Sequence, residues 1–140
     1  MALSDPLLSE YYEQFLKSQK HLQYSFQKVQ KLPLIHENSS EEELESWESF
    51  ASRFARSSDL FISKVLRRLI LTKDPAFRGS VIDLLNNAEK FSWIETAIEW
   101  RRIRELRNIA AHEYASDDLQ RMYKELVHLC PHILKIKVNE

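Results

Sequence analysis

Glycine is nearly absent from this chain, whose 140 residues include one glycine and four prolines. Sheet proteins connect their strands through many tight turns, and tight turns use Gly, Asn and Pro. A chain with so few turn residues is expected to fold as a few long helices. We therefore predict an all-α fold, an up-and-down helical bundle of four to five helices, in a single domain that spans residues 1–140.

Other absences exclude whole classes of protein. A single cysteine, Cys130, excludes an internal disulfide, which suits a reducing compartment. No apolar run approaches the ~20 residues that a membrane helix needs, and the first residues lack the basic start and apolar core of a signal peptide. We expect a cytoplasmic protein that does not enter a membrane. The formal net charge of -1 gives no global attraction for nucleic acid, so an RNA site has to be a local basic patch.

Capping signals and apolar spacing predict the helix boundaries. Ser4 or Asp5 caps a first helix that runs from Pro6 to about Lys31. Three pairs that resemble capping boxes then predict three more helices: Ser40 and Glu43 (to about Leu71), Ser80 and Asp83 (to about Lys90), and Ser92 and Glu95 (Trp93 to about His112). A fifth helix starts at Ser116 or Asp117, and Pro131 kinks or ends it near Cys130.

The predicted fourth helix has an arginine-rich polar face. At about 100° per residue, one continuous stripe collects Arg101, Arg104, Glu105, Asn108 and His112. Arg107 lies on a different face, with Trp93, Trp100 and Ile103. In an ideal helix Arg107 and His112 are roughly 140° apart around the axis and ~7.5 Å apart along it. Both line one cleft only if that cleft wraps around the helix end or forms between two copies of the helix.

Each of these residues also has a purely structural interpretation. A cationic residue in the last turn of a helix is favoured by the dipole, which suits His112. Arg107 could pair with Glu105 or Glu113, and Tyr114 could pack the helix exit. We expect Trp93 and Trp100 in the core rather than as stacking platforms for bases.

His128, Cys130 and His132 superficially resemble metal ligands. Residues two apart on a helix point about 160° away from each other, and a zinc site needs three or four converging ligands. We therefore predict no metal site. No glycine-rich phosphate loop is present either, and we predict no cofactor.

The run Leu106-Arg107-Asn108-Ile109-Ala110-Ala111-His112-Glu113-Tyr114 resembles the HEPN signature, an Arg and a His separated by four to six residues. More narrowly, it resembles the R-x4-H-x-Y form of the HepT toxins. These ribonucleases belong to the MntA–HepT (type VII) toxin–antitoxin systems, in which the toxin is paired with a minimal nucleotidyltransferase antitoxin. The expected helical bundle, the chain length and the place of the motif in the penultimate long helix agree with this resemblance.

The resemblance implies a metal-independent endoribonuclease toxin. The 2′-OH of the RNA attacks the adjacent phosphate, which requires a base, an acid and positive charge at the phosphate. Arg107 and His112 would be the catalytic residues, since His titrates near neutral pH and Arg binds phosphate oxygens in a bidentate way. Asn108 would support them, and Arg101 and Arg104 would extend the cleft as an RNA-binding track.

The resemblance also implies partners. A homodimer that faces two copies of the motif would supply two histidines to one cleft. A cognate MntA-like nucleotidyltransferase antitoxin would transfer AMP to Tyr114, where the added phosphate would repel RNA. Two alternatives remain open: a non-catalytic substrate-binding subunit of a minimal nucleotidyltransferase, and a plain structural or adaptor bundle. Of the three, a toxin alone predicts that expression of the chain arrests growth.

Overall fold

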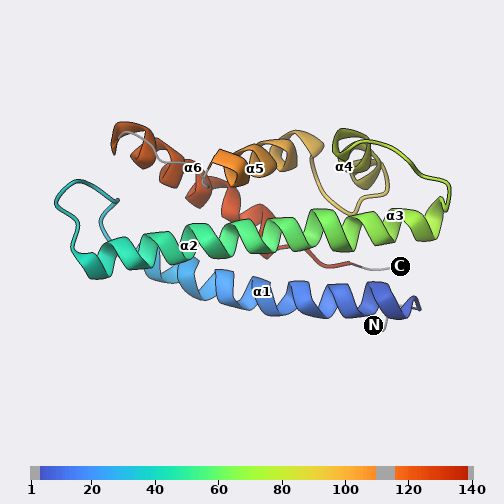
Figure 1. The fold of residues 1–140 in the computed structure, drawn as a ribbon, viewed down its shortest axis with the longest axis horizontal. Helices are drawn as coiled ribbons and strands as arrows, with labels where there is room; N and C mark the ends of the chain where they lie inside the picture. Colours follow the sequence, from blue (N-terminus) through green and yellow to red (C-terminus); the bar gives the residue numbers. More distant parts are fainter. Residues whose placement is uncertain (1–3, 110–115, 139–140) are drawn as a thin grey trace.

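The computed structural model describes residues 4–109 and 116–138, and this part of the chain consists of helices joined by loops, without a strand (Figure 1). The element order is α1 (Pro6–Gln30), α2 (Glu41–Asp59), the π-helical segment η1 (Leu60–Leu66), α3 (Arg67–Lys73), α4 (Val81–Lys90), α5 (Ala97–Ile109) and α6 (Ser116–Leu134). Because α2, η1 and α3 follow one another without a break, the described residues form five helical rods. The predicted all-α bundle is confirmed.

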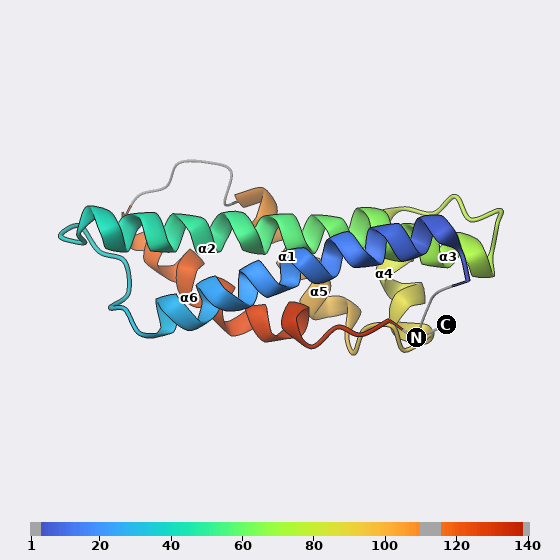
Figure 2. The ribbon, with the colours of Figure 1, turned by 90° about the horizontal axis from the view of Figure 1, so that it is seen from below.

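The long helix α2–η1–α3 is the centre of the bundle. α1 lies along one side of it, and α4, α5 and α6 cover the other side (Figure 1). After α6 the chain turns at Lys135, and residues 136–138 run beside α1 (Figure 2). Gln19 of α1 holds this turn by donating its Nε2–H to the carbonyls of Ile133, Leu134 and Ile136, at 2.9, 3.1 and 3.3 Å. The C-terminal segment is thereby packed onto the first helix.

Three of the predicted helix starts are confirmed by their caps. The Asp5 carboxylate accepts from the Leu7 N–H at 3.3 Å, and Pro6 occupies the first helical position. Ser40 with Glu43, and Ser80 with Asp83, form reciprocal capping boxes at the starts of α2 and α4. Each cap satisfies N–H groups that have no partner within their own helix.

The predicted start of the fourth helix is wrong. α5 begins at Ala97, four residues after the expected Trp93. Ser92 instead has a positive φ of 61° and ends α4, because the Trp93 N–H donates back to the Ala88 carbonyl at 2.8 Å. The start of α5 is capped from a distance, by Glu89 Oε1, which accepts from the Ala97 N–H at 2.8 Å. The predicted end of this helix at His112 lies outside the described residues.

Of the two effects predicted for Pro131, an end of the last helix near Cys130 does not occur, since α6 continues through Pro131 to Leu134. A proline inside a helix removes one backbone hydrogen bond and is normally destabilising. Here Cys130 and Ile133, on either side of it, are both completely buried. Burial of this apolar face offsets the lost hydrogen bond, which keeps the chain helical for one more turn.

Aromatic side chains fill the core where the long helix meets α1 and α5. Phe61 packs against Phe15 and Trp100, with ring centroids 5.2 and 4.8 Å apart. Trp100 is 1% exposed, as expected for a core residue, whereas Trp93 is half-buried and stacks on the exposed ring of Phe91. Among the described residues, no helix is long and apolar enough to cross a membrane.

The π-helical segment η1 keeps the buried residues of the long helix on one face. Buried positions on the long helix repeat every four residues, as in Phe54, Ser58, Ile62, Leu66 and Ile70. Four residues of regular α-helix turn through about 400°, so such a stripe drifts by about 40° per repeat. In a π-helix the backbone hydrogen bonds join residues five apart, which puts more residues in each turn and opposes this drift. Consequently, one helix keeps the same face toward the core along its whole length.

Candidate functional site

Arg107, the first residue of the R-x4-H-x-Y motif, pairs with an acidic residue on another helix. Its Nε–H donates to both carboxylate oxygens of Asp59, at 2.9 and 2.8 Å. Both side chains are partly exposed, at 37% and 44%. The two terminal NH2 groups of Arg107 have no hydrogen-bond partner in the described part of the chain. Among the described residues, the guanidinium is therefore held on its Nε edge only, and the edge with its two NH2 groups, which suits a phosphate, contacts no acceptor.

Asp59 is not the partner that the sequence suggested. Glu105 instead accepts from Arg102 Nη1 at 2.9 Å, and Arg102 also donates from Nη2 to Glu125 on α6 at 2.7 Å. The hydrogen bonds with Glu125 and then Glu105 raise the pKa of Arg102 above its usual value. This network connects α5 to α6, while Arg107 connects α5 to the end of α2. Glu113, the other suggested partner, lies outside the described residues.

The pair lies in a groove of about 770 Å³ between α5 and the long helix. We call it the α2–α5 groove; it is lined by Ser52, Ala55, Arg56, Asp59, Leu60, Ser63 and Lys64 of α2–η1 and by Arg104, Arg107 and Asn108 of α5. Four of these side chains are cationic and one is acidic, which gives the groove a formal charge of +3. A chain with a net charge of -1 thus concentrates positive charge at one site.

The structure brings together three of the residues that the sequence singled out. Arg104, Arg107 and Asn108 all line the α2–α5 groove. Arg101 is exposed on α5, one turn before Arg104, and is not among the lining residues. His112 and Tyr114 lie outside the described residues. The described part of α5 ends at Ile109, and the motif residues that line the groove are Arg107 and Asn108.

The opposite wall of the groove was missed from the sequence. Arg56, Asp59 and Lys64 belong to α2 and η1, which the apolar pattern identified only as a packing helix. One signal was available: these polar residues repeat at intervals of three to five, so they share one exposed side of the helix. What they face depends on how α5 packs, and that contact joins residues almost fifty positions apart.

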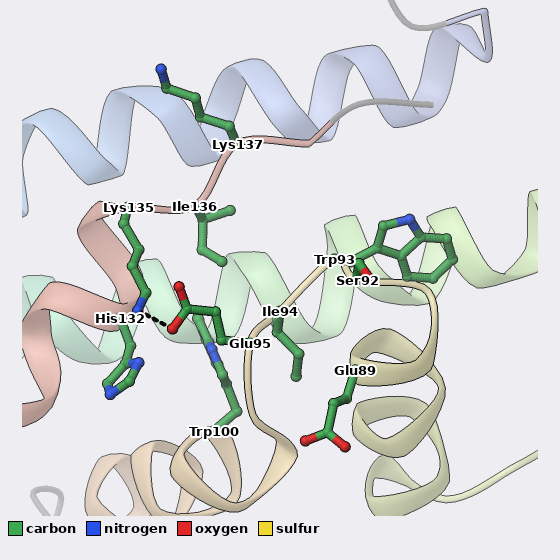
Figure 3. A pocket seen from close by; sticks show the side chains of 10 residues that line it. All are labelled: Glu89, Ser92, Trp93, Ile94, Glu95, Trp100, His132, Lys135, Ile136 and Lys137. Atoms are coloured by element: carbon green, nitrogen blue, oxygen red, sulfur yellow. Dashed lines mark hydrogen bonds and ion pairs between the residues drawn. The ribbon is translucent and has the colours of Figure 1, made fainter.

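A second hollow, of about 510 Å³, lies between the α4–α5 turn and the end of α6 (Figure 3). Two of its charged groups pair with each other, Lys135 Nζ and Glu95 Oε2 at 2.7 Å. His132 borders it, and burial lowers the pKa of this imidazole. With two acidic and two basic side chains in its lining, this hollow lacks the excess positive charge of the α2–α5 groove.

The residues that superficially resembled metal ligands do not form a site. Cys130 is completely buried, and burial raises the pKa of its thiol, while His128 is exposed. His132 Nδ1 is buried without a hydrogen-bond partner in the part of the chain that the structure describes. Within that part, no three His, Cys, Asp or Glu side chains are grouped so that they could hold a metal ion.

A helical bundle with the start of an R-x4-H motif in a basic groove is the architecture expected of a HEPN protein. Comparison with protein families agrees: the family described as "Ribonuclease HepT-like" matches residues 40–137. The chain therefore belongs to the HepT-like ribonuclease family. Neither the curated proteins nor the solved structures contain a match to it. The family match includes the motif and both walls of the groove, and α1 precedes it.

Proposed function

We propose that the protein is a metal-independent endoribonuclease toxin of a toxin–antitoxin pair, with Arg107 and His112 as its catalytic residues. The observation that carries this proposal is the open edge of Arg107 in the α2–α5 groove, whose lining has a formal charge of +3. Membership of the HepT-like ribonuclease family supports the same conclusion. The substrate is RNA in the cytoplasm.

The proposed reaction uses the RNA as its own nucleophile. The 2′-oxygen attacks the neighbouring phosphorus, the bond to the 5′-oxygen breaks, and a base and an acid move one proton each. Arg107 stabilises the charge on the phosphate oxygens, and His112 performs a proton transfer. Three residues of chain span at most about 11 Å, so covalent connection alone keeps His112 near the end of α5 that carries Arg107.

Three further residues of α5 assist in this scheme. Asn108 lines the groove beside Arg107 and supplies an amide donor for a phosphate oxygen. Arg104 lines it one turn earlier, where its charge holds the strand, and Arg101 continues the positive side of α5 beyond the groove.

Asp59 positions Arg107 in this scheme, and we expect Asp59→Asn to separate binding from reaction. Removing a negative charge from the groove should leave RNA affinity equal or higher. Loss of the charged hydrogen bond, about 1.5 kcal/mol, should free the guanidinium and lower kcat by about tenfold. Single-turnover cleavage and equilibrium binding measure the two quantities. Glu125→Gln, which weakens the Arg102 pair instead, is the matched control. A rise in both affinity and kcat would show that Asp59 merely competes with phosphate.

We further propose a homodimer that places two motifs across one cleft, because in-line cleavage needs an acid and a base on opposite sides and each chain has one His112. Light scattering of the purified protein at micromolar concentration should give twice the mass of the 16.7 kDa chain. Monomeric protein with full ribonuclease activity would contradict the shared cleft.

A growth assay tests the function as a whole. Induced expression of the chain alone in a bacterial host should arrest growth, and co-expression of a cognate MntA-like nucleotidyltransferase antitoxin should restore it through AMP transfer to Tyr114. Normal growth, with purified protein that leaves RNA intact, would favour the alternative of a non-catalytic substrate-binding subunit of a minimal nucleotidyltransferase.

A further inference from the structure

We infer that Arg56 and Lys64, on the α2–η1 wall of the α2–α5 groove, bind different phosphates of the RNA strand, so that the groove takes an oligonucleotide and not a single nucleotide. The inference rests on the proposed ribonuclease function and extends it to residues that lie outside the R-x4-H-x-Y motif.

The first support is that these cations are not neutralised by the protein. Elsewhere in the molecule, Arg68 and Lys135 pair with carboxylates at 2.6 and 2.7 Å. The side chain of Arg56 has no ion-pair or hydrogen-bond partner within residues 4–109 and 116–138. The one recorded contact of the Lys64 ammonium is the ring of Tyr11, 5.4 Å from the ring centroid. An exposed cation without a carboxylate partner is available to an anion at little cost.

The second support is the register of the two walls. α5 runs antiparallel to the long helix (Figure 1). Arg107 is fixed to Asp59, so Arg56 lies on the side of this pair toward which α5 ends, and Lys64 lies on the side toward Arg104. Eight residues of helix separate Arg56 from Lys64 by about 12 Å along the axis. A strand with several phosphates can contact both residues, whereas one nucleotide reaches only one end of the groove.

The third support is the π-helical segment itself. The groove residues of the long helix include Ser52, Arg56, Leu60 and Lys64, a four-residue repeat. In a regular α-helix this stripe would drift by about 120° over its three intervals. The wider turn of η1 opposes that drift, and Lys64 stays on the same wall as Arg56.

The two ends of the groove then have different tasks. Arg56 lies toward the end of α5 from which the motif continues to His112, so it contacts the phosphate next to the reacting bond. Lys64 and Arg104 hold the strand farther away, which contributes equally to the ground state and the transition state. Loss of Lys64 should therefore raise KM alone, and loss of Arg56 should also lower kcat.

Binding is best measured with a fluorescent single-stranded 2′-O-methyl RNA, which lacks the nucleophile and cannot be cleaved. Arg56→Ala and Lys64→Ala should each weaken binding by about tenfold and reduce the slope of log K against log salt by about 0.7, the value for one phosphate contact in a single strand. Arg56→Lys and Lys64→Arg should restore most of that slope. A nucleoside monophosphate should not displace the RNA at concentrations at which an unlabelled strand does.

Lys20→Ala is the matched control, since Lys20 is exposed on α1, which does not contact α5. If the parent protein cleaves RNA while both alanine variants keep its affinity and salt slope, Arg56 and Lys64 do not bind the RNA. That result contradicts the inference, and the proposed ribonuclease function stands. If the parent neither cleaves nor binds RNA, both are overturned. Efficient displacement by the mononucleotide would contradict the oligonucleotide assignment.

Discussion

His112→Ala is expected to lower RNA cleavage by about two to four orders of magnitude, the range for loss of a general acid or base. In the proposed reaction, His112 is the only histidine of the motif, and imidazole is the side chain suited to proton transfer near neutral pH, so no neighbour can replace it. RNA binding should change little, because the cations of the α2–α5 groove remain. Growth arrest should disappear together with cleavage.

The control for this variant is His21→Ala. His21 is exposed on α1, away from α5, and its side chain has no recorded contact in the described residues. Both variants should melt as the parent does. Cleavage by His112→Ala at the rate of the parent would refute the catalytic assignment.

Arg107→Ala tests the other half of the pair and should cause a loss of similar size. A comparable surface pair, Arg68 with Asp5, joins the other end of the long helix to α1, and its arginine is 38% exposed against 37% for Arg107. Arg68→Ala therefore controls for the mere loss of an arginine–aspartate contact. If Arg68→Ala and Arg107→Ala reduce cleavage equally, the effect is one of stability.

The second large effect concerns regulation. Tyr114→Phe should remain toxic but should no longer be neutralised by the nucleotidyltransferase partner, because the variant keeps the ring and loses the hydroxyl that accepts AMP. Intact-mass analysis after co-expression should show added AMP on the parent chain and none on the variant. The phosphate of AMP, close to Arg107 in sequence, would repel RNA from the groove.

The environments of the other tyrosines make them informative controls. Tyr123 is 4% exposed, with its pKa raised to about 12 by burial, and Tyr12 accepts a hydrogen bond from the Val138 N–H at 3.1 Å. Tyr24 is 63% exposed, so it is accessible to another enzyme although it lies in a helix. Tyr24→Phe should be modified and neutralised like the parent. AMP on Tyr114→Phe but not on Tyr24→Phe would move the acceptor to Tyr24.

Capping residues in the sequence predicted the helix starts correctly where the cap bonds to a backbone group close to it in sequence. The caps at Asp5, Ser40 and Ser80 were predicted because each bonds to a backbone group two or three residues away. The prediction that Ser92 caps the next helix was wrong. The chain ends α4 at Ser92 with a positive φ, and the side chain of Glu89 caps α5 instead. A capping signal decides a helix start only when no other contact competes for it.

The sequence predicted the residues on the α5 side of the candidate groove and missed those on the long helix. Arg104, Arg107 and Asn108 could be selected because they lie in the recognisable segment or on its polar stripe. Asp59 could not, since its pairing with Arg107 joins residues 48 positions apart and depends on how α5 packs against the long helix. The π-helical segment was not predicted either. The four-residue repeat of Phe54, Ser58, Ile62, Leu66 and Ile70 is the signal in the sequence that indicates it.

The chemistry at the ends of the RNA products tests the central claim most directly. Purified protein should be incubated with a defined RNA in the presence of excess EDTA, and the products analysed by mass spectrometry. Attack by the 2′-OH predicts cleavage without metal, a 2′,3′-cyclic phosphate on one product and a 5′-hydroxyl on the other, with no cleavage by His112→Ala under the same conditions. Cleavage that stops with EDTA, or products that carry a 5′-phosphate, would contradict this account of the protein.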